Sequence, residues 1–589
     1  MKQPTTPILR DIVLVGGGHT HVGVLRNFAM NKMPGVRLTV ICRDTHTPYS
    51  GMLPGYVAGH YQYDDVHIDL RRLAEFADAR FFRSEVVGLD RHTHQVLCSD
   101  RPAGRYDRLS INIGSTPNRT EIGSEGTRTI PVKPIGEFNA RWLALLARAQ
   151  TQPGSMHIAL VGGGAGGVEL ILAMHKRLRH ELSLLDKDPN TLKFSLFTRG
   201  ATILPTHNHS VQRRFIQTLR CRGIALHANA AVVAVDDSGL TTVNGEYHSV
   251  DEVIWVTRAG GASWLKETGL SLDADGFIEV TNTLQTITDQ NIFAAGDVAT
   301  MVNHPREKAG VFAVRQGQPL ARNLRRSLEN NSLRDYHPQR NWLALISTGD
   351  KYAVASRGNF YAAGAWLWRW KDFIDRRFMA KFNDLPAMED NASSPVNSKV
   401  ALAGEEAQQA ISAIAMRCGG CGAKVGASTL NRALSVLRPV ERDDVLIGLH
   451  APDDAAVVRV AHGKAVVHSV DFFRSFIDDP YIFGQIAANH ALGDIFAMGA
   501  EAQSSTAIAT VPQGLESKVE DTLFQMMSGA IDVLHDANCA LVGGHTGEGQ
   551  ELALGFAING LIDDRSDEIM RKGGMRPGDV LILTKPIGT

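Results

Sequence analysis

The sequence predicts an α/β protein made of several globular units, and three observations support that fold class. The chain has 589 residues, several times the length of one typical domain. A β-branched run that leads into glycines and then into a helical pattern occurs twice, at 11–30 and at 156–174. Further β-branched runs alternate with helical patterns up to about residue 380. Such alternation is typical of parallel sheets covered by helices.

Composition and charge describe an ordinary globular chain. Hydrophobic residues make up 44% and charged residues 21%. Lys and Arg number 61 against 62 Asp and Glu, so the net charge of -1 provides no field that would attract nucleic acid. Six cysteines in so long a chain do not match the dense disulfide framework of small secreted domains. We expect a cytoplasmic protein without a nucleic-acid partner.

The first glycine cluster lies in IVLVGGGHTH, where Gly16, Gly17 and Gly18 follow a predicted strand. Because glycines lack side chains, they allow backbone N–H groups and the next helix to approach a pyrophosphate. The third glycine of the G-x-G-x-x-G pattern is replaced by His21. A plain tight turn is therefore the alternative to a nucleotide site.

The second cluster, in IALVGGGAGGVEL, has the complete pattern, with Gly162, Gly164 and Gly167 between an apolar run and a helical segment. This arrangement predicts a dinucleotide site. Later in the chain, NIFAAGDVA ends a strand-like run on Gly296 and Asp297. The aspartate can accept hydrogen bonds from a ribityl hydroxyl, or it can cap a helix.

In this order, the three elements resemble the two-dinucleotide-binding-domain flavoprotein superfamily over residues 10–380. The resemblance implies Rossmann-like domains, with FAD at the first turn, NAD(P)H at the second and Asp297 on the flavin. TPYSGMLPGYVAG at 47–59 and TGDKYAVASRG at 348–358 look like type II NADH dehydrogenases and sulfide:quinone reductases. The family also places Lys133 and the segment 308–311 around the isoalloxazine, with a solvated surface as the alternative for Lys133.

A disulfide reductase is not expected, because Cys42, Cys98 and Cys221 are too far apart in sequence to form a closely spaced thiol pair. Each of these cysteines is better interpreted as a small hydrophobic residue.

The residues that would contact each adenosine ribose depart from the common pattern. Dinucleotide domains usually place Asp or Glu after the second strand, but FSLFTRG offers Thr198 and Arg199. An arginine there suits a 2′-phosphate, so we expect NADPH to be preferred over NADH. After the first unit, VICRD provides Arg43 and Asp44 in place of a clear glutamate, and Asp44 is the candidate contact for FAD.

The segment AWLWRWKDFIDRRFMAKF, at 365–382, interleaves aromatic and basic side chains. Such a helix can lie in a membrane interface, or it can pack on its own domain or on the second half of the chain. No apolar window is long enough to span a bilayer, so any membrane contact would be peripheral, at the inner face.

A polar stretch without aromatic residues begins at Leu385. We interpret residues 385–412 as a linker. It would separate an oxidoreductase-like half at 1–384, whose NAD(P) subdomain covers about 150–275, from a different domain at 413–589.

This second half opens on CGGCGAK, where Cys421 and Lys424 stand on a glycine-rich loop. A zinc ribbon would need a second C-x-x-C, and Cys539 is the only cysteine further along the sequence. A thiol three residues from an ammonium group suits thiolate stabilisation or phosphate binding. Both residues are therefore catalytic candidates.

Carboxylates and a glycine pair follow this loop. Asp453 and Asp454 are predicted at a turn in HAPDDAAVV, and Asp471 at the end of the strand-like AVVHSVD. Carboxylates on turns are ligands that Mg²⁺ prefers when it bridges ATP phosphates; helix caps or solvated turns are the alternative. LVGGHTGEGQE predicts a further turn that contains Gly543, Gly544 and His545.

These elements in this order resemble selenophosphate synthetase (selenide, water dikinase), of the aminoimidazole ribonucleotide synthetase-like superfamily, over about 413–589. The resemblance implies an α+β domain that binds ATP and Mg²⁺, with Cys421 and Lys424 as catalytic residues. The three aspartates would bind the metal, and the GGH turn would lie near the nucleotide. The implied reaction converts selenide, ATP and water to selenophosphate, AMP and phosphate.

The same resemblance has two further consequences. The superfamily commonly dimerises, so we expect a homodimer through this half. The family continues beyond LILTKPIGT into a second domain with another metal aspartate, so we expect little dikinase activity from this sequence alone.

Together the halves predict a bifunctional selenium enzyme, in which an FAD-dependent NAD(P)H oxidoreductase supplies reduced selenium to a selenide, water dikinase. The alternative is a membrane-surface NAD(P)H:quinone or sulfide:quinone oxidoreductase with a non-catalytic C-terminal module. No acceptor motif decides between them, because a fold does not determine its substrate.

Overall fold

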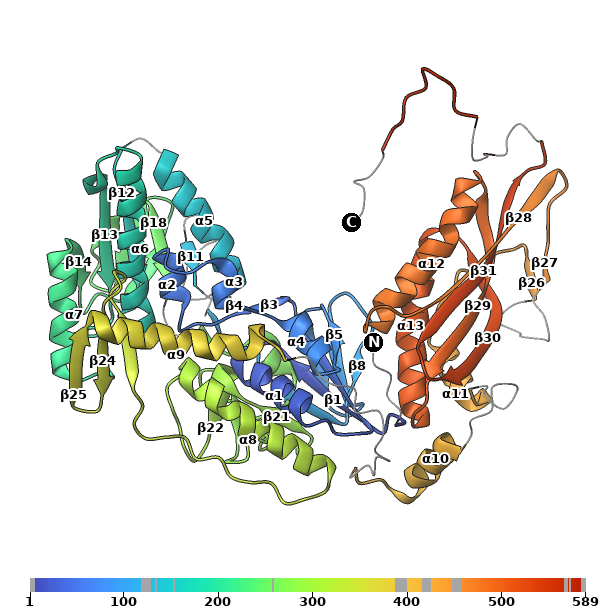
Figure 1. The fold of residues 1–589 in the computed structure, drawn as a ribbon, viewed down its shortest axis with the longest axis horizontal. Helices are drawn as coiled ribbons and strands as arrows, with labels where there is room; N and C mark the ends of the chain where they lie inside the picture. Colours follow the sequence, from blue (N-terminus) through green and yellow to red (C-terminus); the bar gives the residue numbers. More distant parts are fainter. Residues whose placement is uncertain are drawn as a thin grey trace. The chain divides into compact units, whose positions relative to one another are not determined.

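A computed structural model describes residues 6–117, 129–132, 135–151, 154–256, 259–386, 400–415, 425–447, 449, 457–565, 570 and 574–583. The chain divides into two compact units (Figure 1). One unit comprises Arg10–Ala401, and the other comprises Met1–Leu9 with Leu402–Thr589. Within the described ranges, the helices all fall short of the length and apolarity needed to cross a membrane.

The first unit contains a parallel sheet in the order β21-β9-β1-β2-β5. Its central strand, β1 (Arg10–Val15), is buried almost throughout, as expected of a parallel strand covered by helices. Because β2 and β9 flank β1 on opposite sides, the loop after β1 lies at a topological switch point, where α/β sheets bind ligands. The other elements are β2 (Val36–Ile41), β5 (Arg80–Phe82), β9 (Arg108–Ile111), β21 (Ile292–Ala294), α1 (His19–Met30), α4 (Leu70–Phe76) and α8 (Gly310–Leu328).

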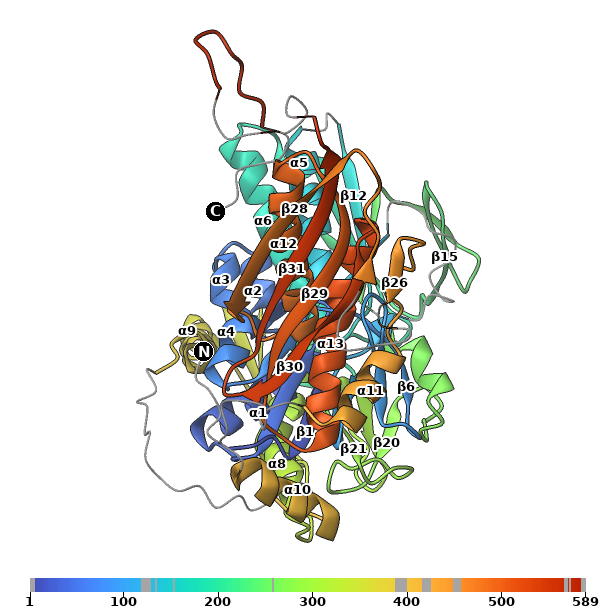
Figure 2. The same cartoon turned by 90° about the vertical axis from the view of Figure 1, so that its right-hand side faces the viewer.

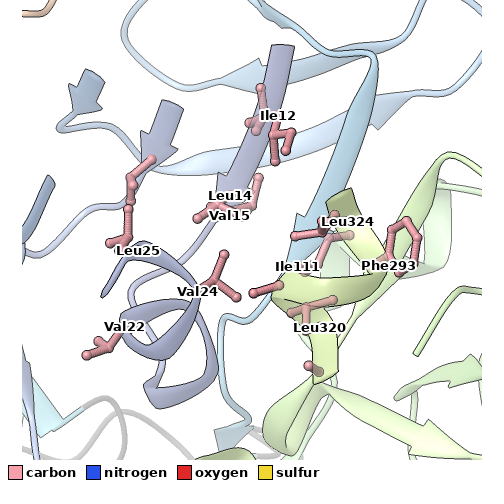
Figure 3. Packing of buried hydrophobic residues seen from close by; sticks show 14 of the residues in the cluster. Ile12, Leu14, Val15, Val22, Val24, Leu25, Ile111, Phe293, Leu320 and Leu324 are labelled. Atoms are coloured by element: carbon pink, nitrogen blue, oxygen red, sulfur yellow. The ribbon is translucent and has the colours of Figure 1, made fainter. Parts of the chain in front are cut away.

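Side chains from β1, α1, β9, β21 and α8 form one buried core, part of which Figure 3 shows. Helices α1 and α8 cross closely, because a Cβ on Gly23 would lie 3.2 Å from the Cα of Gly317 and the reverse also holds. Near this crossing, the Thr20 hydroxyl donates to the Ala313 carbonyl oxygen at 2.8 Å. The crossing therefore brings the start of α8 close to the first glycine cluster.

A second parallel sheet has the order β11-β18-β12-β13-β14. Its central strand is β12 (Met156–Val161), which leads into the second glycine cluster and then into α6 (Ala165–Leu184). The predicted pair of strand–glycine–helix units is thus confirmed, each at the centre of its own sheet. The other elements are β11 (Thr129–Pro131), β13 (Leu192–Phe197), β14 (Ile224–His227), β18 (Glu252–Trp255), α5 (Ile135–Thr151) and α7 (His209–Cys221).

Helix α9 (Ala365–Asn383) follows an antiparallel sheet of β23 (Ala344–Ser347), β24 (Ala353–Arg357) and β25 (Phe360–Gly364). It contacts that sheet and also α3 (Tyr63–Val66) and β4 (His67–Asp69), and Figure 1 shows it as a long yellow helix. Shorter elements of this unit are β3 (His46–Pro48), α2 (Leu53–Val57), β6 (Val86–Asp90), β7 (Gln95–Cys98), β8 (Gly104–Arg105), β10 (Thr116–Pro117), β15 (Val232–Val235), β16 (Gly239–Thr242), β17 (Tyr247–Ser249), β19 (Ala259–Gly260), β20 (Ile278–Val280) and β22 (Ala299–Met301).

The second unit contains a sheet in the order β28-β31-β29-β30, in which β29 and β30 are parallel and the other pairs antiparallel. Figure 2 shows its strands in front of α12 and α13. Ile8 also belongs to this unit, because it forms a bridge to Gly514. The elements are β28 (Lys464–Arg474), β29 (Glu501–Pro512), β30 (Ala540–Gly549), β31 (Ala553–Asp563), α10 (Gly404–Ala415), α11 (Ala427–Ser435), α12 (Pro480–Ala497), α13 (Glu516–Asp536), β26 (Val445–Ile447) and β27 (Val457–Val458).

Two local expectations differ from the structure. The stretch 385–412, interpreted as a linker, contains the beginning of helix α10. The prediction of a turn at Gly543 and Gly544 was wrong, because both residues lie inside strand β30, which pairs with β29. The pairing register shifts next to Gly543, so the two glycines mark an irregularity within a strand.

Candidate functional site

The first glycine cluster forms the turn between β1 and α1. Gly16 has a φ of +89°, a left-handed conformation that favours glycine. A Cβ on Gly16 would lie 2.5 Å from the carbonyl oxygen of Asn112, so no larger residue fits without movement. Helix α1 begins directly after Gly18 and has no side-chain cap at that residue. The turn therefore presents a helix N-terminus of the kind that binds a pyrophosphate.

Asn112 directly follows β9 and holds this turn in place by side-chain hydrogen bonds. Its Oδ1 accepts the backbone N–H groups of Thr20 and His21, at 3.2 and 3.3 Å. Its Nδ2 donates to the carbonyl oxygen of Ala295 at 2.6 Å. Sequence reasoning missed this residue, although its signal is visible in LSINIG, where an amide side chain follows a buried apolar strand. Asn112 thus ties the turn to the residues that precede Asp297.

His21, which replaces the third glycine, is completely buried. Its Nδ1 lies 2.7 Å from the carbonyl oxygen of Gly16, and its Nε2 lies 2.8 Å from the Ser110 hydroxyl. Because a carbonyl oxygen only accepts, Nδ1 carries the proton and Nε2 accepts from Ser110. Burial lowers the pKa of His21 to about 4, so the imidazole is neutral at physiological pH. The side chain acts as a packed hydrogen-bonding spacer between α1 and β1.

The second cluster forms a different kind of turn. Gly162 has a φ of +134°, and a Cβ on it would lie 2.5 Å from the carbonyl oxygen of Val256. A Cβ on Gly167 would overlap the carbonyl oxygen of Gly162, so helix α6 packs on the strand end backbone to backbone. By contrast, the Cβ position of Gly164 has open space around it, and α6 begins there without a side-chain cap. This open helix N-terminus fits the phosphates of a dinucleotide.

The residues after the second strand of each sheet occupy equivalent places. The middle glycine of the second turn packs on Thr198, because a Cβ on Gly163 would lie 2.5 Å from the threonine hydroxyl oxygen. Arg199 follows Thr198 and is exposed. After the first sheet's second strand, a guanidinium nitrogen of Arg43 lies 3.4 Å from a carboxylate oxygen of Asp44. The residues predicted to contact each adenosine ribose thus follow the carboxyl end of the second strand in each sheet.

Asp297 and Gly296 line a cavity beside the start of α8, together with Lys308. The Lys308 Nζ donates to the Ala299 carbonyl oxygen at 2.7 Å and to the Thr300 hydroxyl at 2.8 Å. Burial lowers the pKa of Lys308 to about 8. The cavity therefore combines a carboxylate that can accept hydrogen bonds with an ammonium group that can donate them. These groups fit the hydroxyls and carbonyls of a flavin, whose pyrophosphate would lie on the nearby first turn.

Several predicted residues lie outside the described part of the chain. They are Lys133 of the first unit and Cys421, Lys424, Asp453 and Asp454 of the second. Cys42, Cys98 and Cys221 are described and are free thiols. Within the described ranges, no three His, Cys, Asp or Glu side chains form a group that could hold a metal ion.

Of the predicted magnesium ligands, Asp471 is described. It lies within β28, three residues before the strand ends, and a carboxylate oxygen of Asp471 is 3.8 Å from the His490 Nε2 on α12. Two residues before it on the same strand, the Ser469 hydroxyl donates to Asp494 at 2.8 Å. His545 is exposed on β30. A polar edge thus runs between β28 and α12, with Asp471 and Asp494 as its carboxylates.

Two family models match this chain. One, described as pyridine nucleotide-disulphide oxidoreductase, matches residues 10–317. The other, described as AIR synthase related protein, N-terminal domain, matches residues 452–562. These matches confirm the two resemblances seen in the sequence and their order along the chain.

The second half is similar to bacterial proteins named selenide, water dikinase. The identity is 42% over 175 residues with the protein from Nitratidesulfovibrio vulgaris strain Hildenborough, a match that covers 29% of this chain and 49% of that protein. It is 40% over 172 residues with the protein from Myxococcus xanthus, covering 29% and 47%. The chain spans about half the length of the curated relatives it matches.

The first unit shares its fold with two solved flavoprotein structures. The sulfide:quinone oxidoreductase of Aquifex aeolicus has a TM-score of 0.54 and 18% identity, covering 64% of this chain and 92% of that one. NDH2 of Plasmodium falciparum, solved in complex with NADH, has a TM-score of 0.54 and 16% identity, covering 64% and 100%.

Proposed function

The chain belongs to the pyridine nucleotide-disulphide oxidoreductase family, and from this premise we propose that its first unit oxidises NAD(P)H through bound FAD to reduce a selenium compound. The observation that carries this proposal is the pair of glycine turns, each at the switch point of its own parallel sheet. Gly16, Gly17 and Gly18 would hold the FAD pyrophosphate, with Asp297 on the ribityl chain. Gly162, Gly164 and Gly167 would hold NAD(P)H.

The side chains around these turns would bind and orient the two nucleotides. When bound, the flavin supplies the exchange of two electrons between donor and acceptor. Asp297 would accept hydrogen bonds from the ribityl hydroxyls of FAD, and Lys308 would donate to a carbonyl oxygen of its ring. Arg199 places a positive charge where a 2′-phosphate would lie, which supports a preference for NADPH.

We propose that the second unit takes part in the formation of selenophosphate. Support comes from its similarity to selenide, water dikinases and from the motifs at Cys421 and Lys424. In that reaction selenide, ATP and water give selenophosphate, AMP and phosphate. Asp453, Asp454 and Asp471 would hold Mg²⁺ against the triphosphate, and Gly543, Gly544 and His545 would lie near the nucleotide.

The joining of both units in one chain supports coupling, in which the first makes reduced selenium for the second. The test compares NAD(P)H oxidation by the purified full chain with selenite, with selenodiglutathione and with quinones as acceptors. We expect turnover with a selenium acceptor, and release of selenide that a separate selenide trap detects. Turnover with quinones only would overturn the selenium proposal and leave the oxidoreductase assignment intact.

The second candidate function, a membrane-surface quinone reductase, is favoured by one observation. Helix α9 exposes 59% of Trp366, 43% of Trp370 and 60% of Phe373, with Arg369 and Arg377 exposed on the same side. Large aromatic groups between basic groups suit the interface of an anionic bilayer. If this function is correct, the protein will sediment with anionic liposomes and Trp370→Glu will abolish binding. Leu184→Glu, at an exposed leucine of α6, is the matched control and should bind normally.

We also propose a homodimer through the second unit. The face of its sheet away from α12 and α13 exposes 65% of Val470, 49% of Phe472 and 41% of Ile508. A neighbouring set of exposed apolar side chains on one sheet face marks an association surface. Val470→Asp should lower the mass measured by light scattering to that of a monomer, whereas Val436→Asp, at an exposed position on α11's end, should leave it unchanged. A monomeric wild-type protein would contradict this proposal.

A further inference from the structure

The inner face of α9 carries a buried ion pair. The Lys371 Nζ lies 2.6 Å from the Asp375 Oδ2, and the side chains of the two residues are only 12% and 7% exposed. The same Nζ donates to the carbonyl oxygen of Gly51 at 2.6 Å. Gly51 belongs to the segment TPYSGMLPGYVAG at 47–59, which is part of neither glycine turn. A buried ammonium group on this helix thus holds a distant loop by its backbone.

This loop reaches the first glycine turn. The Tyr49 hydroxyl donates to the Asp375 Oδ1 at 3.2 Å, so Asp375 is bound from two sides. The ring of Tyr49 packs edge-on against the imidazole of His19, with ring centres 5.5 Å apart. His19 is the first residue of α1 and directly follows Gly18. The ion pair is therefore linked through one aromatic contact to the turn proposed to hold FAD.

The helix of this lysine also contacts β23, which in turn contacts α6, the helix that follows the second glycine turn. Glu169 lies on α6, two residues after Gly167, and its carboxylate accepts the backbone N–H of Ser347 at 2.6 Å. Burial raises the pKa of Glu169 to about 7, the charge of Lys371 opposes this rise, and the charge of Asp375 adds to it. One ammonium group thus balances two carboxylates, one from α9 and one from α6.

We propose that Lys371 is a positioning residue that holds the two nucleotide turns in register for hydride transfer from NAD(P)H to FAD. It rests on the proposed function of these turns. Hydride transfer depends on the distance and alignment of two bound groups, and small displacements cost large factors in rate. Lys371 is connected to the first turn through Gly51 and Asp375. It is connected to the second through β23, which contacts α9 and whose Ser347 N–H donates to Glu169 on α6.

Removal of the ammonium group has two physical consequences. The Gly51 carbonyl loses its donor, so the loop of Tyr49 loses an anchor on α9. Asp375 and Glu169 then lack their common positive charge, so the Glu169 carboxylate takes up a proton more readily. The first consequence slows hydride transfer, and the second moves its pH dependence to higher pH.

The experiment uses the full chain loaded with flavin. The saturating rate of flavin reduction by NADPH and the Kd of NADPH are measured by anaerobic stopped flow between pH 5.5 and 9. We expect Lys371→Met to keep its flavin, to leave the Kd within about threefold and to lower the saturating rate by about tenfold or more. We also expect the apparent pKa of its rate profile to rise. Lys381→Met, at an exposed lysine of the same helix, should match the wild type throughout.

A second pair of variants separates positioning from simple structural support. Asp375→Asn removes the negative charge that raises the pKa of Glu169, so its rate profile should move to lower pH, opposite to Lys371→Met. Glu169→Gln should remove this titration from the profile. A bulk loss of structure would not shift the two profiles in opposite directions. If Lys371→Met does not fold, Asp375→Asn still tests the proposal by the direction of its shift.

Two failures are distinguishable. If the wild type binds no flavin, or if NADPH does not reduce it, the proposed function itself is wrong. If the wild type behaves as proposed and Lys371→Met has the same saturating rate and pH profile, the role of Lys371 is wrong and the proposed function stands.

Discussion

The two glycine turns of the first unit solve the same packing problem in different ways. In the second turn the carbonyl oxygen of Gly162 abuts the backbone of Gly167, and only a glycine fits there. In the first turn the equivalent carbonyl, that of Gly16, accepts a hydrogen bond from the imidazole of His21. One helix is packed by the absence of a side chain, and the other by a buried side chain that supplies a donor.

This difference shows what the third glycine of the pattern specifies. It sets the spacing between helix and strand, whereas the phosphate binding proposed for both turns would belong to the helix N-terminus that they share. The first turn achieves its spacing with extra polar partners, Ser110 and Asn112. In the second, the close approach of the Gly162 carbonyl oxygen to Gly167 sets the spacing. We therefore expect the first turn to depend on a hydrogen-bond network and the second on steric fit.

The largest effect should follow a change at the position where only glycine fits. Gly167→Val forces α6 away from the carbonyl of Gly162, so kcat/KM for NADPH should fall by about a hundredfold or more. Flavin content should remain normal, because the first turn is untouched. Gly166→Ala is the matched control, since its Cβ position has open space and alanine favours a helix. A near-normal kcat/KM for NADPH in Gly167→Val would show that steric fit is not the determinant.

The hydrogen-bond network of the first turn is tested by Asn112→Ala. This change leaves the N–H groups of Thr20 and His21 and the carbonyl of Ala295 without their partner. The free energy of unfolding should fall by about 3 kcal/mol, and flavin should dissociate more readily. Urea denaturation and the absorbance of bound flavin measure these quantities. Asn31→Ala, at an exposed asparagine after α1, should change neither. A stable, flavin-replete Asn112→Ala protein would refute the network.

Protonation of His21 provides a subtler test of the same network. Burial lowers the pKa of His21 to about 4, whereas an unfolded histidine titrates near 6.5. The unfolded chain therefore binds more protons between these pH values, so stability falls as the pH is lowered from 6.5 towards 4. The loss attributable to His21 should reach up to about 3 kcal/mol. His21→Gln should lose that part of the pH dependence when urea denaturation is compared at pH 7 and 4.5. Parallel stability curves for both proteins would contradict the assignment.

The smallest effect concerns the choice of nicotinamide cofactor. Arg199→Glu replaces a positive charge with the acidic residue common to NADH-binding domains, so the ratio of kcat/KM for NADPH over NADH should fall by about tenfold or more. Arg213→Glu, at an exposed arginine of α7, should leave the ratio unchanged. Equal efficiency of the wild type with the two cofactors would refute the predicted preference for NADPH.

The sequence predicts those parts of the molecule that local patterns determine. Both glycine turns and Asp297 follow apolar strands, and hydrophobic runs report burial reliably in parallel sheets. The roles of Asn112, Glu169 and Lys371 depend on partners that lie far away in sequence, which no local pattern reveals. The prediction of a turn at Gly543 was wrong for the same reason. Glycine permits a turn, but pairing with β29 across the sheet decides that the segment is a strand.

A matched pair of substitutions tests most directly the central claim that the first turn holds FAD and the second NAD(P)H. In Gly16→Ala and Gly162→Ala, the new Cβ would lie 2.5 Å from a backbone carbonyl oxygen in each case. The measurement is flavin content, followed by anaerobic reduction with NADPH. We predict that Gly16→Ala loses flavin, whereas Gly162→Ala retains flavin that NADPH no longer reduces efficiently. The reverse pattern, or full reduction in both variants, would contradict the assignment of the two turns.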